Sequence, residues 1–366
     1  LTGELIIKFK YSNWNEDIPF GEITSDGEVF ECNDLNFERT ILHHYNLYQK
    51  NKDLVLQNEE FKRRIESKKF NPLENSIERR KFGYNFKRFI FSVDPENCED
   101  VDDTFSYYEN NEFIELGIHI AQPTFWLTKE DLDNLNMNKF STLYSSKRID
   151  LYGQSITLAS SLKEGIEKPA YSIIYKYNKQ VINNSSDRYL IDDFEIELFP
   201  SLITVDKNFS YDSSELKSIE ECIKLKNLTD KLNSKNNDYH DIVEFWMIQT
   251  NSVIGSEIQK KYNKVIPYRV NDINIFEQSS ACEETPENIY DAFNFRNMNK
   301  AIYKFPIDSE DICFHHSLQI SKYCHFTSPI RRIIDTYIHL CITYGIDIDD
   351  LNVELINQIE KNTKKF

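Results

Sequence analysis

Four aspartates lie within ten residues of one another directly after an apolar, strand-like run: Asp94, Asp100, Asp102 and Asp103. Asp100 and Asp102 are two positions apart, so an extended backbone directs both side chains to one side. Crowded carboxylates raise one another's pKa values unless a cation compensates them. Ligand sets made only of oxygen suit Mg²⁺ or Mn²⁺. The spacing therefore predicts a divalent cation site, and the alternative is a solvated acidic loop.

The alternative carries weight because Asp and Glu total 60 residues in this chain, so acidic clusters also arise by chance. One specific cation site can be excluded. Counted from Asp94, the sixth position of an EF-hand loop is Glu99 instead of glycine, and the twelfth is Phe105 instead of glutamate.

A second segment that could take part in chemistry lies at the start of a helix predicted near the end of the chain. Ser328 is the predicted N-cap, Pro329 takes the first helical position, and Gly345 ends the helix. The side chains expected to form its buried stripe are Ile330, Ile334, Tyr337 and Cys341.

Two arginines, Arg331 and Arg332, then fall in the first helical turn, where the helix dipole disfavours positive charge. A phosphate group bound to the free amides and a guanidinium would reverse that sign. The alternative is an ion pair between Arg331 and Asp335, four residues later. Both arrangements can hold together, with Asp335 orienting the arginine.

Taken together, the two segments resemble the RNB catalytic domain of RNase II, RNase R and the exosome nuclease Dis3. The family's acidic pattern D-P-x-x-[CA]-x-D-x-D-D matches Asp94, Pro95, Cys98, Asp100, Asp102 and Asp103. Its second pattern, H-F-T-S-P-I-R-R-Y-x-D-L-x-x-H, matches His325 to Arg332, then Asp335 and His339. The two motifs occur in the family's order, more than two hundred residues apart.

Weaker matches lie between the motifs, and the resemblance covers about residues 76 to 363. They are the strand Gly117 to Ala121, the segment ending at Tyr144, the segment ending at Tyr211, and a helix carrying Glu244 and Asn251. Three positions depart from the family: Gln122 replaces an Asp, Ile333 a Tyr and Leu340 an Arg. The stretch before Asp241 is short, and one aromatic of the family's base clamp has no visible counterpart.

The resemblance implies hydrolysis of single-stranded RNA from its 3′ end by a two-metal mechanism that uses Mg²⁺ or Mn²⁺. The residues implied as metal ligands are Asp94, Asp100, Asp102 and Asp103, with Asp102 and Arg331 as catalytic groups. The residues implied as RNA-binding are Tyr144, Tyr211, Ser328, Arg331 and Arg332, supported by Glu244, Asp335 and His339. For each tyrosine, an ordinary core or surface position is the alternative, since the chain has 21 tyrosines.

The predicted strands and helices that position these residues indicate an α+β fold. The resemblance implies that this fold is an RNB catalytic domain, in which helices pack on a mixed sheet. A strand ending at Pro95 is followed by a hairpin of residues 104–108 and 113–120, and a strong helix spans 241–261. Residues 1–75 are expected to form a partial OB or cold-shock-like β segment with a connector. Residues 76–366 are expected to form the catalytic domain, with no S1 domain in this chain.

The amino-acid composition excludes several other classes of protein. No apolar run approaches the roughly 18 residues that span a bilayer, so no membrane partner is expected. The seven cysteines form no closely spaced pair, which argues against zinc knuckles and disulfides and favours a cytoplasmic location. The net charge of −17 argues against a general nucleic-acid coat but not against a local RNA site.

Two rival functions remain. The first is an RNA-binding protein that keeps the RNB fold without catalysis, against which the four intact aspartates and Arg331 argue. The second is an acidic interaction scaffold, which accounts for the charge but for neither motif. Protein partners are not indicated.

Overall fold

The computed structural model describes residues 51–83, 88–136, 139–144, 148–184, 194–271, 300–307 and 311–363, with side chains from residue 58 except at 183 and 184. It also describes the backbone of four short strands near the N-terminus. β1 (Leu5–Ile6) pairs with β4 (Phe30–Glu31), and β2 (Phe9–Asn13) pairs with β3 (Phe20–Ile23), both antiparallel. Most of residues 1–50, where the OB-like segment is expected, lie outside the described residues.

A mixed sheet of seven strands forms the centre of the described chain, in the order β11-β6-β7-β8-β9-β10-β5. Its strands are β5 (Arg80–Phe82), β6 (Ile90–Asp94), β7 (Asp103–Glu109), β8 (Phe113–Ala121), β9 (Glu167–Asn178), β10 (Glu195–Thr204) and β11 (Lys207–Ser210). The inner pairs are antiparallel, whereas the edge pairs β11·β6 and β10·β5 are parallel. The predicted mixed sheet, the strand before Pro95 and the hairpin are confirmed.

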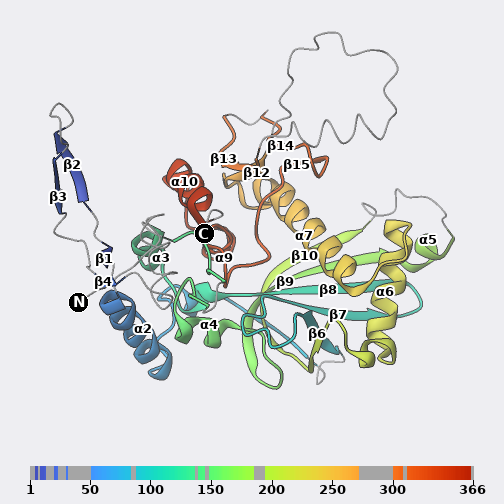
Figure 1. Cartoon of the computed structure of the whole chain (residues 1–366). Helices are drawn as coiled ribbons and strands as arrows, with labels where there is room; N and C mark the ends of the chain where they lie inside the picture. Colours follow the sequence, from blue (N-terminus) through green and yellow to red (C-terminus); the bar gives the residue numbers. More distant parts are fainter. Residues whose placement is uncertain are drawn as a thin grey trace, which may run out of the picture.

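Helices pack around this sheet, and the longest of those described, α7, passes over it towards α6 (Figure 1). The helices are α2 (Asn51–Glu66), α3 (Lys129–Asn136), α4 (Gln154–Ser160), α5 (Lys179–Asn184), α6 (Glu220–Asn233), α7 (Tyr239–Tyr262), α9 (Ile333–Tyr344) and α10 (Val353–Thr363). Two small antiparallel pairs, β12 (Tyr268–Val270) with β13 (Ile302–Lys304) and β14 (Phe314–His315) with β15 (Ile320–Ser321), lie at one end of α7 (Figure 1).

Local sequence explains why α7 begins and packs where it does. Asp238 accepts a hydrogen bond from the backbone N–H of Asp241, whose side chain accepts one from the Asp238 N–H, so the two form a capping box. Gly255 allows close packing, because a Cβ there would lie 1.8 Å from the carbonyl oxygen of Lys322. Trp246 is fully buried and donates its indole N–H to Thr229 Oγ1 at 2.8 Å. The predicted helix over 241–261 is confirmed.

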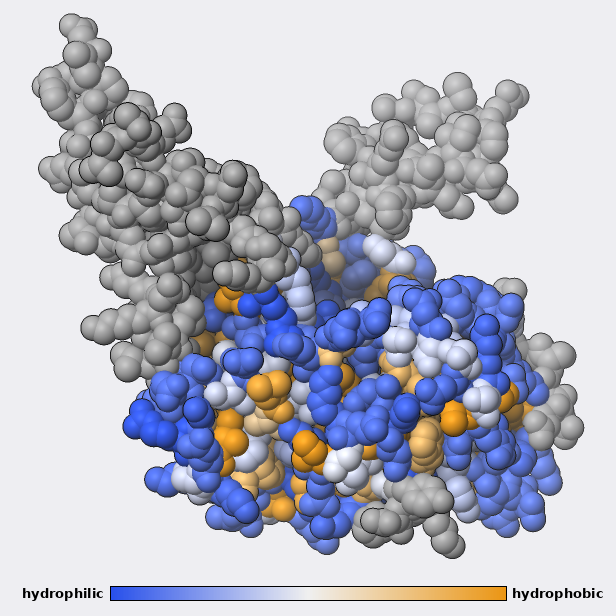
Figure 2. Space-filling view, turned by 60° about the horizontal axis from the view of Figure 1, so that its bottom comes forward, coloured by the Kyte–Doolittle hydropathy of each residue, from blue (hydrophilic) through white to orange (hydrophobic). Residues whose placement is uncertain are grey.

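The last long apolar helix is buried more completely than a single stripe would require. Every residue of α9 from Ile333 to Thr343 is buried, including Asp335 and His339. Figure 2 shows a mostly hydrophilic outer face with small, separate apolar patches. None of the described helices is both long and apolar enough to cross a membrane.

Candidate active site

The connection from β6 to β7 carries all four aspartates. Asp94 ends β6 and Asp103 begins β7, so the sheet itself fixes both ends of this acidic loop (residues 94–103). A left-handed residue, Asn97, with a φ of 60°, turns the chain after Pro95. The return is anchored by the Val101 backbone N–H, which donates to Ser161 Oγ at 3.0 Å. A short, tethered loop therefore holds four like charges together.

Burial and repulsion raise the pKa values of these carboxyl groups. Burial raises the pKa of Asp94 to about 6, with Asp100 adding to the shift and Lys163 opposing it. Burial and then the charge of Asp94 raise the pKa of Asp103 to about 7. The pKa of Asp102 is raised well above its ordinary value by complete burial, although the charge of Arg331 opposes this. A bound cation would lower these pKa values, because its positive charge favours the ionised carboxylates.

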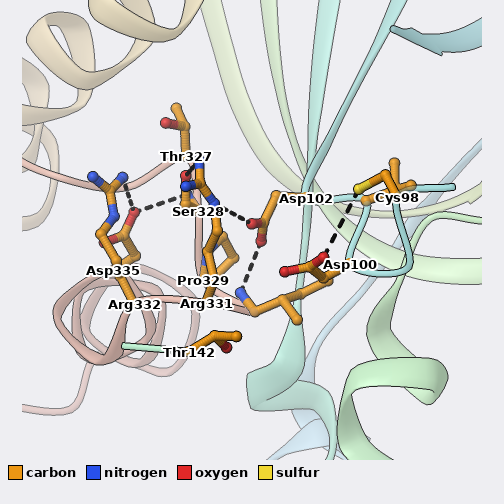
Figure 3. Close-up of polar contacts among 12 residues, drawn as sticks. Cys98, Asp100, Asp102, Thr142, Thr327, Ser328, Pro329, Arg331, Arg332 and Asp335 are labelled. Carbon is orange, nitrogen blue, oxygen red and sulfur yellow. Dashed lines mark hydrogen bonds and ion pairs between the residues drawn. The ribbon is translucent and has the colours of Figure 1, made fainter. Parts of the chain in front are cut away.

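Asp102 links the acidic loop to the second sequence motif across the molecule. Its Oδ1 accepts a hydrogen bond from the backbone N–H of Ile330 at 2.8 Å, and its Oδ2 lies 3.3 Å from Arg331 Nε. Arg331 also donates to Ser328 Oγ at 3.0 Å, while about half of its side chain remains exposed (Figure 3). The structure thus brings together Asp102, Ser328 and Arg331, as the two motifs predict.

The prediction that Ser328 caps the helix is wrong. α9 begins at Ile333 with Arg332 as its N-cap, and residues 328–332 form a tight turn before it. The cause lies in Asp335, whose Oδ1 accepts from the Ser328 backbone N–H at 2.8 Å and draws the turn back over the helix start. Ser328 therefore does not cap α9. Arg331 lies before the helix instead of in its first turn, so its position gives no sign of a bound anion through the helix dipole.

The alternative considered for Arg331, an ion pair with Asp335, is not formed. Arg332 makes that pair instead, with its Nη2 2.9 Å from Asp335 Oδ1 (Figure 3). Both side chains of this pair are largely shielded, at 20% and 0% exposure. The predicted contact of Arg332 with RNA remains a prediction, but the side chain is turned to the helix rather than to the acidic loop. Arg331 alone of the two lines the pocket described below.

The predicted RNA-stacking residue Tyr144 is more than half exposed at the acidic loop. Its hydroxyl donates to a carboxylate oxygen of Asp100. Arg148, which sequence reasoning missed, pairs with Glu99 at 2.7 Å, with Asp150 at 2.7 Å and with Asp100 at 3.5 Å. Nothing local in the sequence marks Arg148, because these partners meet only in the folded chain.

Tyr211 lies at the same pocket and stacks on another residue missed from the sequence. The rings of Tyr211 and His240 are nearly parallel, with centroids 3.5 Å apart and planes inclined by 14°. His240 shares a face of α7 with Val243 and Met247, because side chains three and seven positions apart lie on one side of a helix. That periodicity could have identified His240.

Two further residues predicted to support the site, His339 and Glu244, lie in different environments. His339 is buried, stacks on Phe326 with centroids 3.9 Å apart, and binds the Phe326 carbonyl oxygen through Nε2 at 3.0 Å. Its role is therefore in the packing behind the site. Glu244 is exposed on α7, and it is its neighbour Val243 that lines the pocket. Gln122, a departure from the family pattern, is buried and donates to Thr343 Oγ1 at 2.8 Å.

These groups surround one cavity of about 600 Å³. It is lined by Val93, Asp94, Pro95, Asn97, Cys98, Glu99, Asp100, Asp102, Asp103, Tyr144, Arg148, Tyr211, Val243, Met247 and Arg331. Carboxylates and two guanidinium groups form one part of its wall, and aromatic and apolar side chains form another. Such a cavity can hold a phosphodiester group and an adjoining base.

The residues present fit a divalent cation. All candidate ligands are carboxylates, and Asp94 Oδ2 is buried without a hydrogen-bond partner. Among the described residues, however, no three histidine, cysteine or acidic side chains already converge on one point. Oxygens of Asp100 and Asp102 instead contact Tyr144 and Arg331. A bound cation would have to exchange with these partners.

Comparison with known sequences identifies relatives over most of this chain. A family model of the RNB domain matches residues 85–219 and 213–346. Ribonuclease R of Chlamydia pneumoniae is 23% identical over 333 residues, which cover 73% of this chain and 48% of that protein. The human exosome complex exonuclease RRP44 is 22% identical over 337 residues, covering 74% and 35%. The chain thus spans about half the length of the first relative and about a third of the second.

Solved structures show the same fold. The apo form of Mycoplasma genitalium RNase R superposes with a TM-score of 0.72 at 16% identity, covering 98% of this chain and 67% of that one. That enzyme has also been solved with ribose-methylated single-stranded RNA and with double-stranded RNA. Yeast Ssd1, described as a pseudonuclease, superposes with a TM-score of 0.66 at 14% identity, covering 97% and 53%.

Proposed function

Because the chain belongs to the RNB domain family, we propose that it is a hydrolytic exoribonuclease acting on single-stranded RNA from the 3′ end. The products would be nucleoside 5′-monophosphates. The observation that carries this proposal is the contact of Asp102 with Arg331 inside a cavity that holds four aspartates. It unites a cation-binding set and a phosphate-binding group at one point of the fold.

Asp94, Asp100, Asp102 and Asp103 would hold Mg²⁺ or Mn²⁺ in this proposal. Such cations supply activation of water and stabilisation of the leaving 3′ oxygen. The raised pKa values of Asp94 and Asp103 support the assignment, because an added positive charge would favour their ionised forms.

Arg331 would bind the scissile phosphate. Its guanidinium is fixed on one side by Asp102 and Ser328, which leaves the exposed part of the side chain to face the cavity. A planar guanidinium can donate two parallel hydrogen bonds to phosphate oxygens and stabilise charge that develops there.

Tyr144 and Tyr211 would bind bases by stacking, which tolerates any sequence. Tyr211 has one ring face covered by His240, so it would offer a base only its other face. The apolar side chains of Val243 and Met247 continue that wall of the cavity. The arrangement suits an enzyme that must accept successive nucleotides of any kind.

The experiment is incubation of the chain with 3′-tailed RNA labelled at its 5′ end, with Mg²⁺ or with EDTA. We expect shortening from the 3′ end and release of nucleoside 5′-monophosphates only with the cation. Internal cuts or products with 3′-phosphates would contradict the proposal.

A second function, RNA binding without hydrolysis, is favoured by one observation, the structural likeness to the pseudonuclease Ssd1. RNA retention without any monophosphate release in Mg²⁺ or Mn²⁺ would support it. The four aspartates and Arg331 make hydrolysis the better-supported function.

A further inference from the structure

Cations without carboxylate partners are concentrated at the end of α2. Lys62, Arg63, Lys68 and Lys69 are all exposed, and no acidic side chain of the described ranges lies within ion-pair distance of them. Their neighbour Arg64, by contrast, pairs with Asp131 at 2.7 Å. Since the chain carries a net charge of −17, four such cations within eight residues stand out against an acidic background.

The helix dipole of α2 explains the position of only one of these four cations. Arg63 lies in the last turn of α2, where a positive charge is favourable. Lys68 and Lys69 lie beyond the helix, and Lys68 adopts a left-handed backbone with a φ of 51°. Glycine or asparagine is the usual residue at such a position. The backbone hydrogen bonds that end the helix here, from the Lys68 N–H to the Ile65 carbonyl and from the Lys69 N–H to the Arg64 carbonyl, do not use the lysine side chains.

A cavity of about 460 Å³ opens beside these cations. The carboxylate of Glu60, which lies 3.4 Å from Arg64, is part of its wall. The cavity is lined by Glu60, Arg63, Arg64, Ser67, Lys69, Phe70, Pro72 and Thr128. Its size falls in the range of about 300–1,000 Å³ that small-ligand sites occupy. The acidic-loop cavity has a separate set of lining residues, so the two sites are distinct.

Phe70 gives this second cavity an aromatic surface. Phe70 is 38% exposed. It packs against Phe125 and Trp126, with centroid distances of 4.6 Å and 5.3 Å. The support from within the fold holds the ring in place while part of it faces solvent. Cations next to a supported aromatic ring are the elements of a single-stranded nucleic acid site.

We propose that this cavity is a second RNA-binding site, in which Arg63 and Lys69 contact phosphates and Phe70 stacks on a base. The choice of RNA as the ligand rests on the proposed function. A free anion would use the cations but not the aromatic surface, whereas a strand uses both. The site would retain a part of the RNA strand that the acidic-loop cavity does not hold.

The test measures RNA binding in EDTA, so that no strand is cut. A single strand of about 24 nucleotides and one of about 6 are compared, since single-strand sites hold about 4–16 nucleotides. The double variant Arg63→Glu/Lys69→Glu is the main variant. We expect its affinity for the long strand to fall about tenfold or more, with less than about a twofold change for the short strand. The slope of the logarithm of the binding constant against the logarithm of the salt concentration should become less negative by about 0.7 for each lost phosphate contact.

The matched control is Lys260→Glu/Lys261→Glu, which makes the same charge change in the last turn of α7, where both lysines pair with Glu257. A loss for the control equal to that of the main variant, or an equal loss for both strand lengths, would overturn the proposal. Phe70→Leu keeps an apolar side chain but removes the flat ring, and we expect a several-fold loss for the long strand. An unchanged affinity in this variant would overturn the assignment of RNA in favour of a general polyanion.

This result is separable from the proposed function. If the wild-type chain never hydrolyses RNA but shows the length-dependent loss, the second site stands and the nuclease assignment falls. If it hydrolyses RNA and the main variant binds both strands normally, the nuclease assignment stands and the second site falls.

Discussion

The acidic loop and the turn before α9 are both short, charged and anchored, yet they differ in how their charges are compensated. In the turn, Oδ1 of the fully buried Asp335 accepts hydrogen bonds from Arg332 and from the Ser328 backbone, while its Oδ2 is buried without a hydrogen-bond partner. In the loop, Asp94 has a buried oxygen without a partner, and burial raises the pKa of Asp103 to about 7. The single buried carboxylate of the turn is therefore paired with a cation of the same chain, whereas in our proposal the carboxylates of the loop bind a cation from outside.

Arg331 belongs to both regions and shows what the difference teaches. It extends from the compensated turn to Asp102 of the uncompensated loop, and half of its side chain stays exposed. Its neighbour Arg332 is committed to Asp335. Of these two adjacent arginines, one therefore lines the cavity and the other stabilises the fold.

The largest expected effect tests the loop as a cation site. Asp102→Asn should lower turnover about a thousandfold or more, because the amide supplies a weaker ligand and spoils the geometry at the reacting phosphate. RNA affinity should persist, since one negative charge is removed. Single-turnover cleavage and RNA binding are the measurements, with the exposed Asp212→Asn as the control. Near-normal turnover by Asp102→Asn would remove the basis for the site.

The next effect sharpens the contrast between the two arginines. Arg331→Ala should lower turnover about a hundredfold or more, while the free energy of unfolding falls by less than it does for Arg332→Ala, because the Arg331 side chain is half exposed and the Ile330 N–H still binds the buried Asp102. Arg331→Lys should restore little, since ammonium lacks the planar fork. Arg332→Ala should cost about 3–5 kcal/mol, because it leaves the buried Asp335 without its cation.

Thermal melting and single-turnover cleavage on the same three variants decide this prediction. Were Arg331→Ala to unfold in proportion to its lost activity, Arg331 would be a structural partner of Asp102 and the phosphate role would have to be withdrawn.

A third effect concerns stability against pH. The folded-state pKa of Asp103, about 7, lies above the unfolded value of about 3.9, so the folded chain binds more protons between these limits. The free energy of unfolding should then fall as pH rises from about 4 to about 7, by about 4 kcal/mol for this group. The measurement is the difference between wild type and Asp103→Asn by denaturant unfolding in EDTA, with Asp349→Asn as an exposed control.

Adding Mg²⁺ at pH 8 should return much of that stability to the wild type and little to Asp103→Asn. A difference that does not change with pH, or equal stabilisation of both proteins by Mg²⁺, would contradict the account of the loop as an uncompensated site.

The smallest effects concern the aromatic wall. Tyr144→Ala and Tyr211→Ala should each weaken RNA binding by about 1–3 kcal/mol, while turnover of saturating substrate changes less. His240→Ala should weaken binding by about 0.5–1.5 kcal/mol through the loss of its stack on Tyr211, and His240→Phe should restore it. The matched control is His316→Ala, which removes an edge contact with Phe314 away from the cavity. Unchanged affinity in all three pocket variants would return these residues to ordinary surface positions.

Local sequence was sufficient for the elements of the fold that local chemistry decides. Pro95 ends a strand, the polar turn after Glu109 makes a hairpin, and Asp238 with Asp241 caps a helix, all within a few residues of chain. The start of α9 escaped the same reasoning. Ser328 and Pro329 are a good local start for a helix, but the side chain of Asp335 folds the turn back and Thr142 binds it from a distant segment.

What the sequence by itself determined is the inventory of the site: four aspartates in a family spacing, an arginine pair, and a β6–β7 connection that holds the acids together. What only the tertiary structure decided is how the charges are partnered. Arg331 meets Asp102 across more than two hundred residues, Arg148 meets Asp100, and His240 covers Tyr211. The physical reason is that spacing sets which side chains a segment can offer, whereas desolvation and ion pairing depend on every element that packs around them.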